Sequence, residues 1–267
     1  MVEWEQKLKD FPAYKKYETF NRKTITNEEN NPCNDLYFDN EEAEKFCKQA
    51  VEILKELPRI TDDKARNEEC AYFQHWFSDT VRRKFSNKDR FFSNYDLSNY
   101  LFDVINTFNY DKYNKTPNKC YASRNAEYVK IEKDLHDYFI NFDSISCKGL
   151  SKKTCQMYYN YVQEILPHYK DRRDRHLCCY LANGEVETKC KNYFKCDKRY
   201  DPKKLLKNLE KEMEIIDRYG QVDKSSWDEL VAKYDAEQQS KYQYWYSYDP
   251  YTYDYYSPSQ YSSINQS

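Results

Sequence analysis

The chain has 267 residues, enough for one large domain or two small ones with a buried core. Its 43 basic and 45 acidic residues are mixed along the chain, so we expect no single-sign surface that attracts nucleic acid or an anionic membrane. Only three glycines occur, and no glycine-rich phosphate loop is present, which excludes dinucleotide and P-loop enzymes and leaves no expected cofactor. We find neither a secretory signal nor an apolar run of about 18 residues, so we expect no transmembrane helix.

The first half of the chain shows a series of segments with helical spacing. A short helix is expected before Pro12, which interrupts it, and a polar loop over 21–32 follows. Asp39 is expected to cap the next helix, and Ser93 or Asn94 a later one. The apolar stripes of these segments are Trp4, Leu8 and Phe11; Phe46, Ala50, Ile53 and Leu57; Cys70, Phe73, Trp76, Phe77 and Val81; and Leu97, Leu101, Val104 and Phe108. The third stripe, in a helix starting near Lys64, carries the most aromatic residues and predicts a central helix.

The second half continues the pattern. Helices are expected over 123–142, from Ser151 with Pro167 bending or ending the last turn, from Asp201-Pro202 to a C-cap at Gly220, and more weakly from Ser226. Their stripes are Tyr128, Ile131, Leu135, Tyr138 and Phe142; Cys155, Tyr158, Val162, Ile165 and Tyr169; Leu206, Leu209, Met213 and Ile216; and Trp227, Leu230, Val231 and Tyr234.

Beyond Ser240 the composition becomes tyrosine-rich, and Pro250 and Pro258 prevent a long strand there, so we expect a disordered or loosely docked tail. The prediction is an all-α fold: a disulfide-stabilised, bundle-like helical domain with long loops over 1–220, a weak helical extension over 221–239 and a low-complexity tail over 240–267. Its core is expected to include Phe73, Trp76, Phe77, Tyr158, Val162, Leu206 and Leu209.

The ten cysteines indicate an oxidising compartment and up to five disulfides, against the alternative of buried free thiols. The candidates are Cys33, Cys47, Cys70, Cys120, Cys147, Cys155, Cys178, Cys179, Cys190 and Cys196. The last four lie in a turn-rich loop that leads directly into a helix. Neighbouring residues point apart, so Cys178 and Cys179 should not pair with each other. We expect one to close locally on Cys190 or Cys196 and the other to reach a helix cysteine, tying the loop to the helices.

Zinc is the alternative for this loop, with His168 and His176 completing a ligand set. The cysteine spacings lack a close pair such as C-x-x-C, so we favour disulfides and predict no metal site.

Two Cys and His pairs raise the possibility of a thiol protease: Cys70 with His75, and Cys178 with His176. Five residues apart on a helix is a poor separation for a hydrogen bond, and the second pair lies in the disulfide-like loop. We therefore predict no catalytic residue, and we expect His136 to be packed or solvated.

Phe73, Trp76 and Phe77 could instead form an exposed binding patch, but their spacing favours the core. The polar loops over 21–32, 109–121 and 170–195 are better candidates for partner contacts.

Four segments resemble the Vir branch of the Plasmodium interspersed repeat (PIR) variant proteins, within a likeness running from about Trp4 to Tyr219. They are ECAYFQHWFSDTV at 69–81, LHDYFINFDSI at 135–145, CQMYYNYVQEI at 155–165 and CCYLANGEVETKCKNYFKCDKRYDPKKLL at 178–206. The resemblance implies an α-helical ectodomain with disulfides, made by a malaria parasite and exported into or onto the infected red cell. Typical members also carry a transmembrane helix, where this chain has its tyrosine-rich tail.

The expected function is that of a non-enzymatic variant surface antigen acting in immune evasion and host-cell adhesion, with a host-cell surface protein or an antibody as partner. The alternative is a soluble exported adaptor or scaffold in the host-cell cytosol or vesicles, using the tyrosine-rich tail for protein contacts or as a phosphorylation site.

Overall fold

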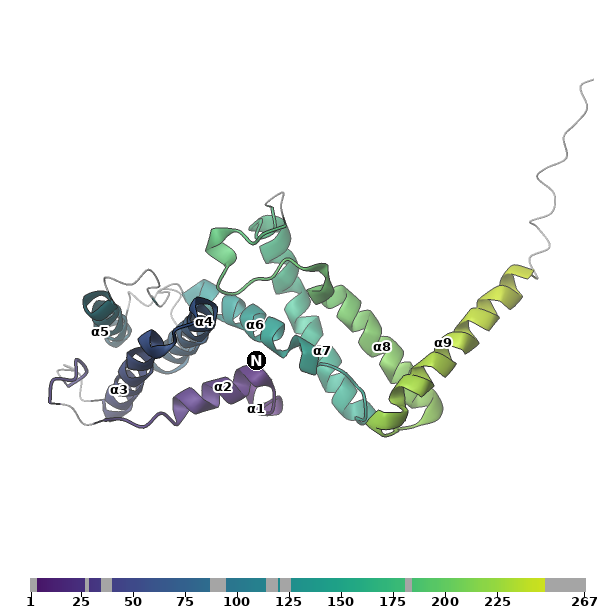
Figure 1. Cartoon of the computed structure of the whole chain (residues 1–267), viewed down its shortest axis with the longest axis horizontal. Coiled ribbons are helices and arrows are strands. Elements are labelled where there is room, and N and C mark those ends of the chain that lie inside the picture. The colour runs from purple at the N-terminus through teal and green to yellow at the C-terminus, as the bar shows by residue number, and fades with distance from the viewer. Residues whose placement is uncertain are drawn as a thin grey trace, which may run out of the picture. The chain divides into compact units, whose positions relative to one another are not determined.

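The structure is a computed structural model that describes residues 4–26, 29–34, 40–86, 95–113, 120, 126–180 and 184–247. Within these ranges every regular element is a helix and no strand occurs, which confirms the all-α class (Figure 1). None of the helices described is long and apolar enough to cross a bilayer. The tyrosine-rich segment after residue 247 lies outside the described residues.

The helices follow the chain in the order α1 (Trp4–Lys7), α2 (Pro12–Asn21), α3 (Glu41–Glu56), α4 (Asp63–Thr80), α5 (Asp96–Tyr113), α6 (Ala126–Asn141), α7 (Lys152–Lys170), α8 (Pro202–Tyr219) and α9 (Lys224–Ser247). Short helical turns extend some of these helices. The 3₁₀ turn η1 (Leu57–Arg59) follows α3, and the π-helical turn η5 (Asp171–Arg175) follows α7. Helix α9 continues past residue 240 to Ser247.

Side-chain caps explain several helix starts. The carboxylate of Asp62 accepts a hydrogen bond from the Ala65 N–H at 2.7 Å at the start of α4, and Asp201 does the same for Lys203 at 2.9 Å before Pro202 begins α8. At α3 the cap is Asn40, which accepts from Ala43 at 2.9 Å; the predicted cap Asp39 lies outside the described residues, as do Ser93 and Asn94.

Two expectations about proline differ in outcome. The first helix, α1, ends at Lys7, before Pro12 is reached, and Pro12 occupies the first position of α2, where no backbone N–H is needed. Pro167 does not end α7, which continues to Lys170. Gly220 follows α8 with a φ of 81°, and its N–H donates to the Ile216 carbonyl at 2.8 Å, which confirms the predicted C-cap.

The chain divides into two compact units. The first contains Met1–Ser146 and Gln156–Leu209, and the second contains Cys147–Cys155 and Glu210–Ser267. The predicted domain boundaries at 220 and 240 stay predictions.

Aromatic side chains from α3, α4 and α5 form much of the core of the first unit. Phe46 stacks on Phe77 with ring centroids 5.1 Å apart, and Phe77 meets Phe102 edge-on at 5.3 Å. Trp76 packs against Phe46 and donates its indole N–H to the Asn21 side chain at 2.8 Å. Such buried rings are in fixed mutual positions, and they are not available as an exposed patch.

The other expected core positions are mostly buried: Phe73, Val162, Leu206 and Leu209. Tyr158 is only half-buried, and its ring packs edge-on against Phe11. Three residues further along α7, Tyr161 is fully buried and is the tyrosine of this helix that belongs to the core.

In the second unit a disulfide between Cys147 and Cys155 closes the turn before α7. The Cys147 N–H donates to Glu212 of α8 at 2.8 Å, while Ile215, Ile216 and Trp227 are buried. The unit therefore joins its helices through a covalent link, a charged hydrogen bond and a small apolar core.

Candidate functional site

The loop between α7 and α8 is held by two disulfides of its own. Cys178 pairs with Cys190 and Cys179 with Cys196, with Cα atoms 5.7 and 5.6 Å apart. The prediction that the adjacent cysteines do not pair with each other is confirmed. The prediction that one of them reaches a helix cysteine is wrong, because both bridges close within the loop.

The remaining cysteines also pair. The bonds are Cys33–Cys47, Cys70–Cys120 and Cys147–Cys155, and the structure describes no free cysteine. All four loop cysteines are used in bridges, so none offers the thiolate that zinc requires. Cys70 is likewise bridged, which removes the nucleophile from both proposed Cys and His pairs.

Aromatic packing, and not a disulfide, attaches the loop to the helices. Phe194 stacks on Tyr169 of α7 at 5.2 Å and meets Phe139 of α6 edge-on at 5.4 Å. Tyr200 packs against Phe139 and Phe142 at 5.5 and 4.9 Å, and its carbonyl accepts a hydrogen bond from the buried Tyr138 hydroxyl at 2.8 Å. The loop thus presents an aromatic face to α6 and α7.

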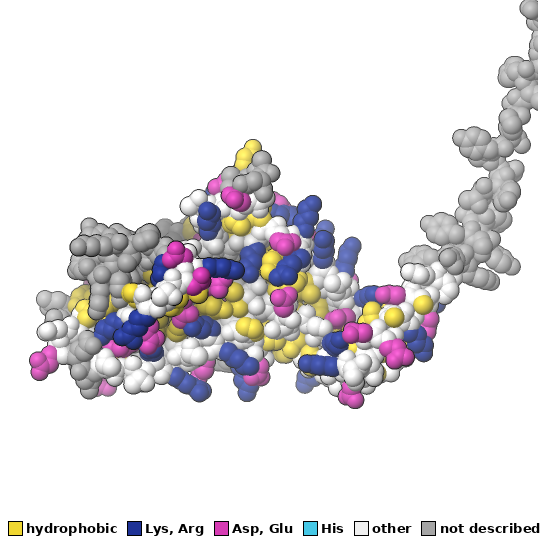
Figure 2. Space-filling model, viewed as in Figure 1, with side chains coloured by type: hydrophobic (Ala, Val, Ile, Leu, Met, Phe, Trp, Pro, Cys, Tyr) yellow, Lys and Arg dark blue, Asp and Glu magenta, His cyan; other side chains and the backbone are white. Residues whose placement is uncertain are grey.

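Two large apolar side chains at the start of the loop are exposed. Leu177 is 46% exposed and Tyr180 is 75% exposed. Leu177 has a φ of 55°, a left-handed conformation that is unfavourable for a branched side chain. It is held by a local turn in which the Tyr180 N–H donates to the Leu177 carbonyl at 3.2 Å, beside the first disulfide. Hydrophobic atoms are visible at this end of the loop, next to undescribed residues (Figures 1 and 2).

A buried arginine, Arg172, contacts the start of the loop. Arg172 is only 2% exposed, and its guanidinium lies over the rings of Tyr128 and Tyr193, at 4.8 and 5.9 Å from the ring centroids. Its carbonyl accepts from the Cys178 N–H at 3.1 Å. Burial raises the pKa of nearby Glu132 to about 7, although the charge of Arg172 acts in the opposite direction. Arg172 therefore connects α6, the end of α7 and the bridged loop.

His168 and His176, the two histidines considered as zinc ligands, have no free thiol to act with, because all described cysteines are bridged. The Nε2 atom of His176 is 3.4 Å from an Asp171 carboxylate oxygen, and burial lowers the pKa of its imidazole. Burial also lowers the pKa of His168. Among the described residues, the one grouping of possible metal ligands consists of Cys147, Cys155 and Glu212, and its two sulfurs are bonded to each other.

A buried ionic cluster in the first unit was not anticipated. Lys133 on α6 contacts Asp137 at 2.6 Å and Glu5 at 2.7 Å, and the Tyr17 hydroxyl donates to Asp137 at 2.5 Å. Burial opposes ionisation of Asp137, but the charge of Lys133 lowers its pKa to about 2. In the sequence, Lys133 and Asp137 are four residues apart on a predicted helix, which is the spacing of an ion pair. The same spacing is typical of solvated helix faces, so it does not predict a buried cluster.

Two histidines complete this cluster. The rings of His75 and His136 lie 4.5 Å apart, and both residues are buried. His136 Nδ1 is 3.3 Å from Asp137, while His75 Nε2 is 3.3 Å from the Asn192 carbonyl in the bridged loop. His136 is therefore packed, one of the two outcomes expected for it. Burial, with the neighbouring His136, lowers the pKa of His75 to about 3.

Of the loops expected to make contacts, 170–195 is described except for residues 181–183, and 21–32 except for residues 27–28. Most of 109–121 lies outside the described residues. The structure therefore brings two candidate contact regions into view, and the longer one is the doubly bridged loop.

Comparison with known proteins adds the family. Residues 11–262 match the family model described as Plasmodium vivax Vir protein. No curated protein and no solved structure matched the chain. The matched region contains all ten cysteines and every helix from α2 to α9. Because the match covers far more than half of the sequence, the chain belongs to the Vir protein family and is a variant antigen of Plasmodium.

Proposed function

We propose that this variant antigen acts in host-cell adhesion and immune evasion from the surface of the infected red cell, with the doubly bridged loop as a contact region. One observation carries the proposal: Leu177 and Tyr180 are exposed on a loop whose base is closed by two disulfides and packed on α6 and α7. A pre-ordered loop loses little conformational entropy when a partner binds it, and exposed aromatic residues are frequent anchors of interfaces.

The disulfides also bear on the compartment. Five bridges persist in an oxidising environment, whereas cytosolic thiols are kept reduced. This supports display at a surface over a role as an adaptor in the host-cell cytosol.

The test is binding of the full chain, labelled with a fluorophore, to host red cells, endothelial cells and leukocytes. The double variant Leu177→Ser and Tyr180→Ser should lose at least about tenfold in affinity, because each exposed anchor typically contributes about 1 kcal/mol or more to an interface. Lys191→Ser changes another exposed position of the same loop and should leave binding within about twofold. Binding that is unchanged in the double variant, or absent on every cell type, contradicts the adhesive role of this loop.

Antibodies from infected hosts provide a separate readout for immune recognition. They should bind the double variant less well than Lys191→Ser if the exposed end of the loop is an epitope. Equal binding to both variants would contradict that part of the proposal.

A further inference from the structure

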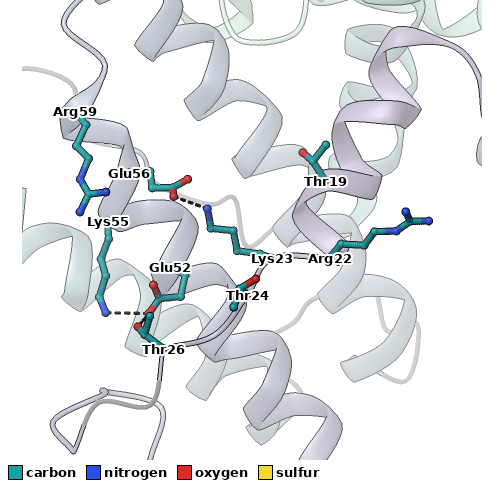
Figure 3. Close-up of a pocket in the computed structure, with 9 residues that line it drawn as sticks. All are labelled: Thr19, Arg22, Lys23, Thr24, Thr26, Glu52, Lys55, Glu56 and Arg59. Atoms are coloured by element: carbon teal, nitrogen blue, oxygen red, sulfur yellow. Dashed lines mark hydrogen bonds and ion pairs between the residues drawn. The ribbon is translucent and has the colours of Figure 1, made fainter.

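A concave site lies in the first unit, and none of its lining residues belongs to the bridged loop. It has a volume of about 500 Å³ and is formed by the end of α2, the segment after it, the last turn of α3 and η1 (Figure 3). Its lining consists of Thr19, Arg22, Lys23, Thr24, Thr26, Glu52, Lys55, Glu56 and Arg59. Volumes of this order accommodate small molecules, and every lining side chain is polar or charged.

Four cationic side chains face two carboxylates in this site. Lys23 pairs with Glu56 at 2.5 Å, and Lys55 pairs with Glu52 at 2.9 Å. Each carboxylate is therefore already matched by one lysine. The two arginines are in excess, so the lining carries a net positive charge.

The two arginines differ in direction. Arg22 points away from the other lining side chains in Figure 3, and its Nε donates to Glu18 at 2.6 Å. Arg59 lies on the same side as Lys55, and within the described part of the chain its guanidinium makes neither an ion pair nor a hydrogen bond. Arg59 is thus the cation that is available to a ligand.

Glu52 reports the electrostatic potential on the floor of the site. Burial acts to raise its pKa, yet the Thr26 hydroxyl at 2.6 Å and the charges of Lys55 and Lys23 lower the pKa below its ordinary value. A positive potential that keeps a partly buried carboxylate ionised will also favour the negative group of a ligand.

Hydroxyl and carboxylate groups complete the lining. Glu52 and Glu56 retain oxygen lone pairs that can accept hydrogen bonds, and the Thr24 hydroxyl makes no hydrogen bond within the residues described. These groups suit a ligand that carries several hydroxyls of its own.

We propose that this pocket binds an acidic sugar. The guanidinium of Arg59 holds the sugar carboxylate through paired N–H donors, since its planar geometry matches a carboxylate. Thr24, Glu52 and Glu56 bind the ring hydroxyls. The proposal includes no residue of the bridged loop and does not depend on the adhesive role of that loop.

The test is calorimetric titration of the full chain with N-acetylneuraminic acid and with glucuronic acid, using glucose as the neutral control. At least one acidic sugar should bind and glucose should not. Arg59→Gln should weaken binding by about tenfold or more, because a charged hydrogen-bonded pair contributes about 1.5–3 kcal/mol. Arg22→Gln removes the same charge from the side chain that points away, and it should change the affinity by less than about threefold.

Several outcomes would overturn the proposal. The first is that neither acidic sugar binds, and the second is that Arg59→Gln leaves the affinity unchanged. The third is that Arg22→Gln weakens binding as much as Arg59→Gln, which would mean that the overall positive charge is responsible. Inorganic phosphate that binds as tightly as either sugar would also overturn it, since the site would then select any small anion.

The same variants separate the source of the sugar. If the ligand is sialic acid of a cell-surface glycan, sialidase treatment of red cells should reduce binding of the wild-type chain to the level of Arg59→Gln, and a glucuronidase should do so for glucuronic acid. If the ligand is a free sugar, binding to cells should change with neither enzyme, while calorimetry still shows the effect of Arg59. The Leu177 and Tyr180 double variant should retain sugar affinity, so that failure of the loop proposal and failure of this one are distinguishable.

Discussion

The Lys133 and Asp137 side chains form an ion pair that is almost completely removed from water, with 6% and 2% of their surfaces exposed. Removing two charges from water is costly, and the mutual attraction of the pair offsets this cost only when further polar contacts are present. Glu5 and Tyr17 supply those contacts in the first unit. This arrangement makes each partner of the cluster dependent on the others.

Asp137→Asn should therefore lower the free energy of unfolding by about 3 kcal/mol or more, because Lys133 keeps its buried charge and loses its nearest counter-ion. Chemical denaturation followed by circular dichroism measures the change. Glu18→Gln breaks the exposed pair with Arg22 and should cost less than about 1 kcal/mol. If the two variants lose equal stability, Glu5 alone is sufficient to neutralise Lys133.

His75 predicts a pH dependence. Its pKa is about 3 in the folded chain and ordinarily 6.5, so between these values the unfolded chain binds more protons. Stability should accordingly fall as the pH is lowered from 6.5 towards 3, with a slope of up to about 1.4 kcal/mol per pH unit from this residue. Glu132, whose pKa is raised, contributes with the opposite sign between its ordinary 4.5 and about 7.

Comparing His75→Gln with the wild-type chain at each pH isolates the histidine, since the contribution of Glu132 is common to both. The variant should show a smaller loss of stability between pH 6.5 and 4. Parallel curves for the two proteins would mean that His75 is not held neutral in the folded state.

At the level of elements, the bridged loop and the pair α6 and α7 form one packed arrangement. The stripe predicted for 123–142 included Tyr128 and Ile131, which are half-buried, and missed Val129 and Phe139, which are buried. A helix that meets neighbours on more than one side has a wider buried face than a single stripe. Phe139 is buried because Phe194 and Tyr200 of the loop cover it.

Phe194→Ala should lower the free energy of unfolding by about 3–5 kcal/mol, the usual cost of removing a buried aromatic ring. It should also increase hydrogen exchange in residues 190–200 while the loop disulfides remain intact. Tyr180→Ala, at the exposed end of the same loop, should change stability by less than about 0.5 kcal/mol. A small effect for Phe194→Ala would show that the disulfides alone hold the loop in place.

For the whole molecule, the structure describes five disulfides and two compact units. The chain separations closed by the bridges range from 8 residues for Cys147–Cys155 to 50 for Cys70–Cys120. In the chain-entropy model, such bridges contribute about 2–4 kcal/mol each by restricting the unfolded chain. Full oxidation is therefore a condition for the stability of the native chain.

Mass spectrometry of the protein isolated from infected cells should show that no cysteine reacts with an alkylating reagent before reduction, whereas all ten react after reduction and unfolding. The isolation must include the reagent from the point of lysis, so that thiols are trapped in their original state. Ten reactive thiols before reduction would place the chain in a reducing compartment and contradict surface display.

The helical class, the positions of most helices and the presence of a disulfide framework could be predicted from the sequence, because these depend on local spacing, capping residues and cysteine count. Asp201 and Gly220 act within a few residues of their position, so their roles could be predicted.

How distant segments meet could not be predicted, because it depends on the packing of the whole chain. Nothing in the spacing of Cys178 and Cys179 states that both close within the loop, and nothing near Lys133 shows that Glu5 and Tyr17 will surround it. Likewise, the pocket brings Arg59 to residues after α2 that lie far from it in the chain. Disulfide pairing, buried charge and binding sites depend on which side chains become neighbours in space, and that property belongs to the packed chain as a whole.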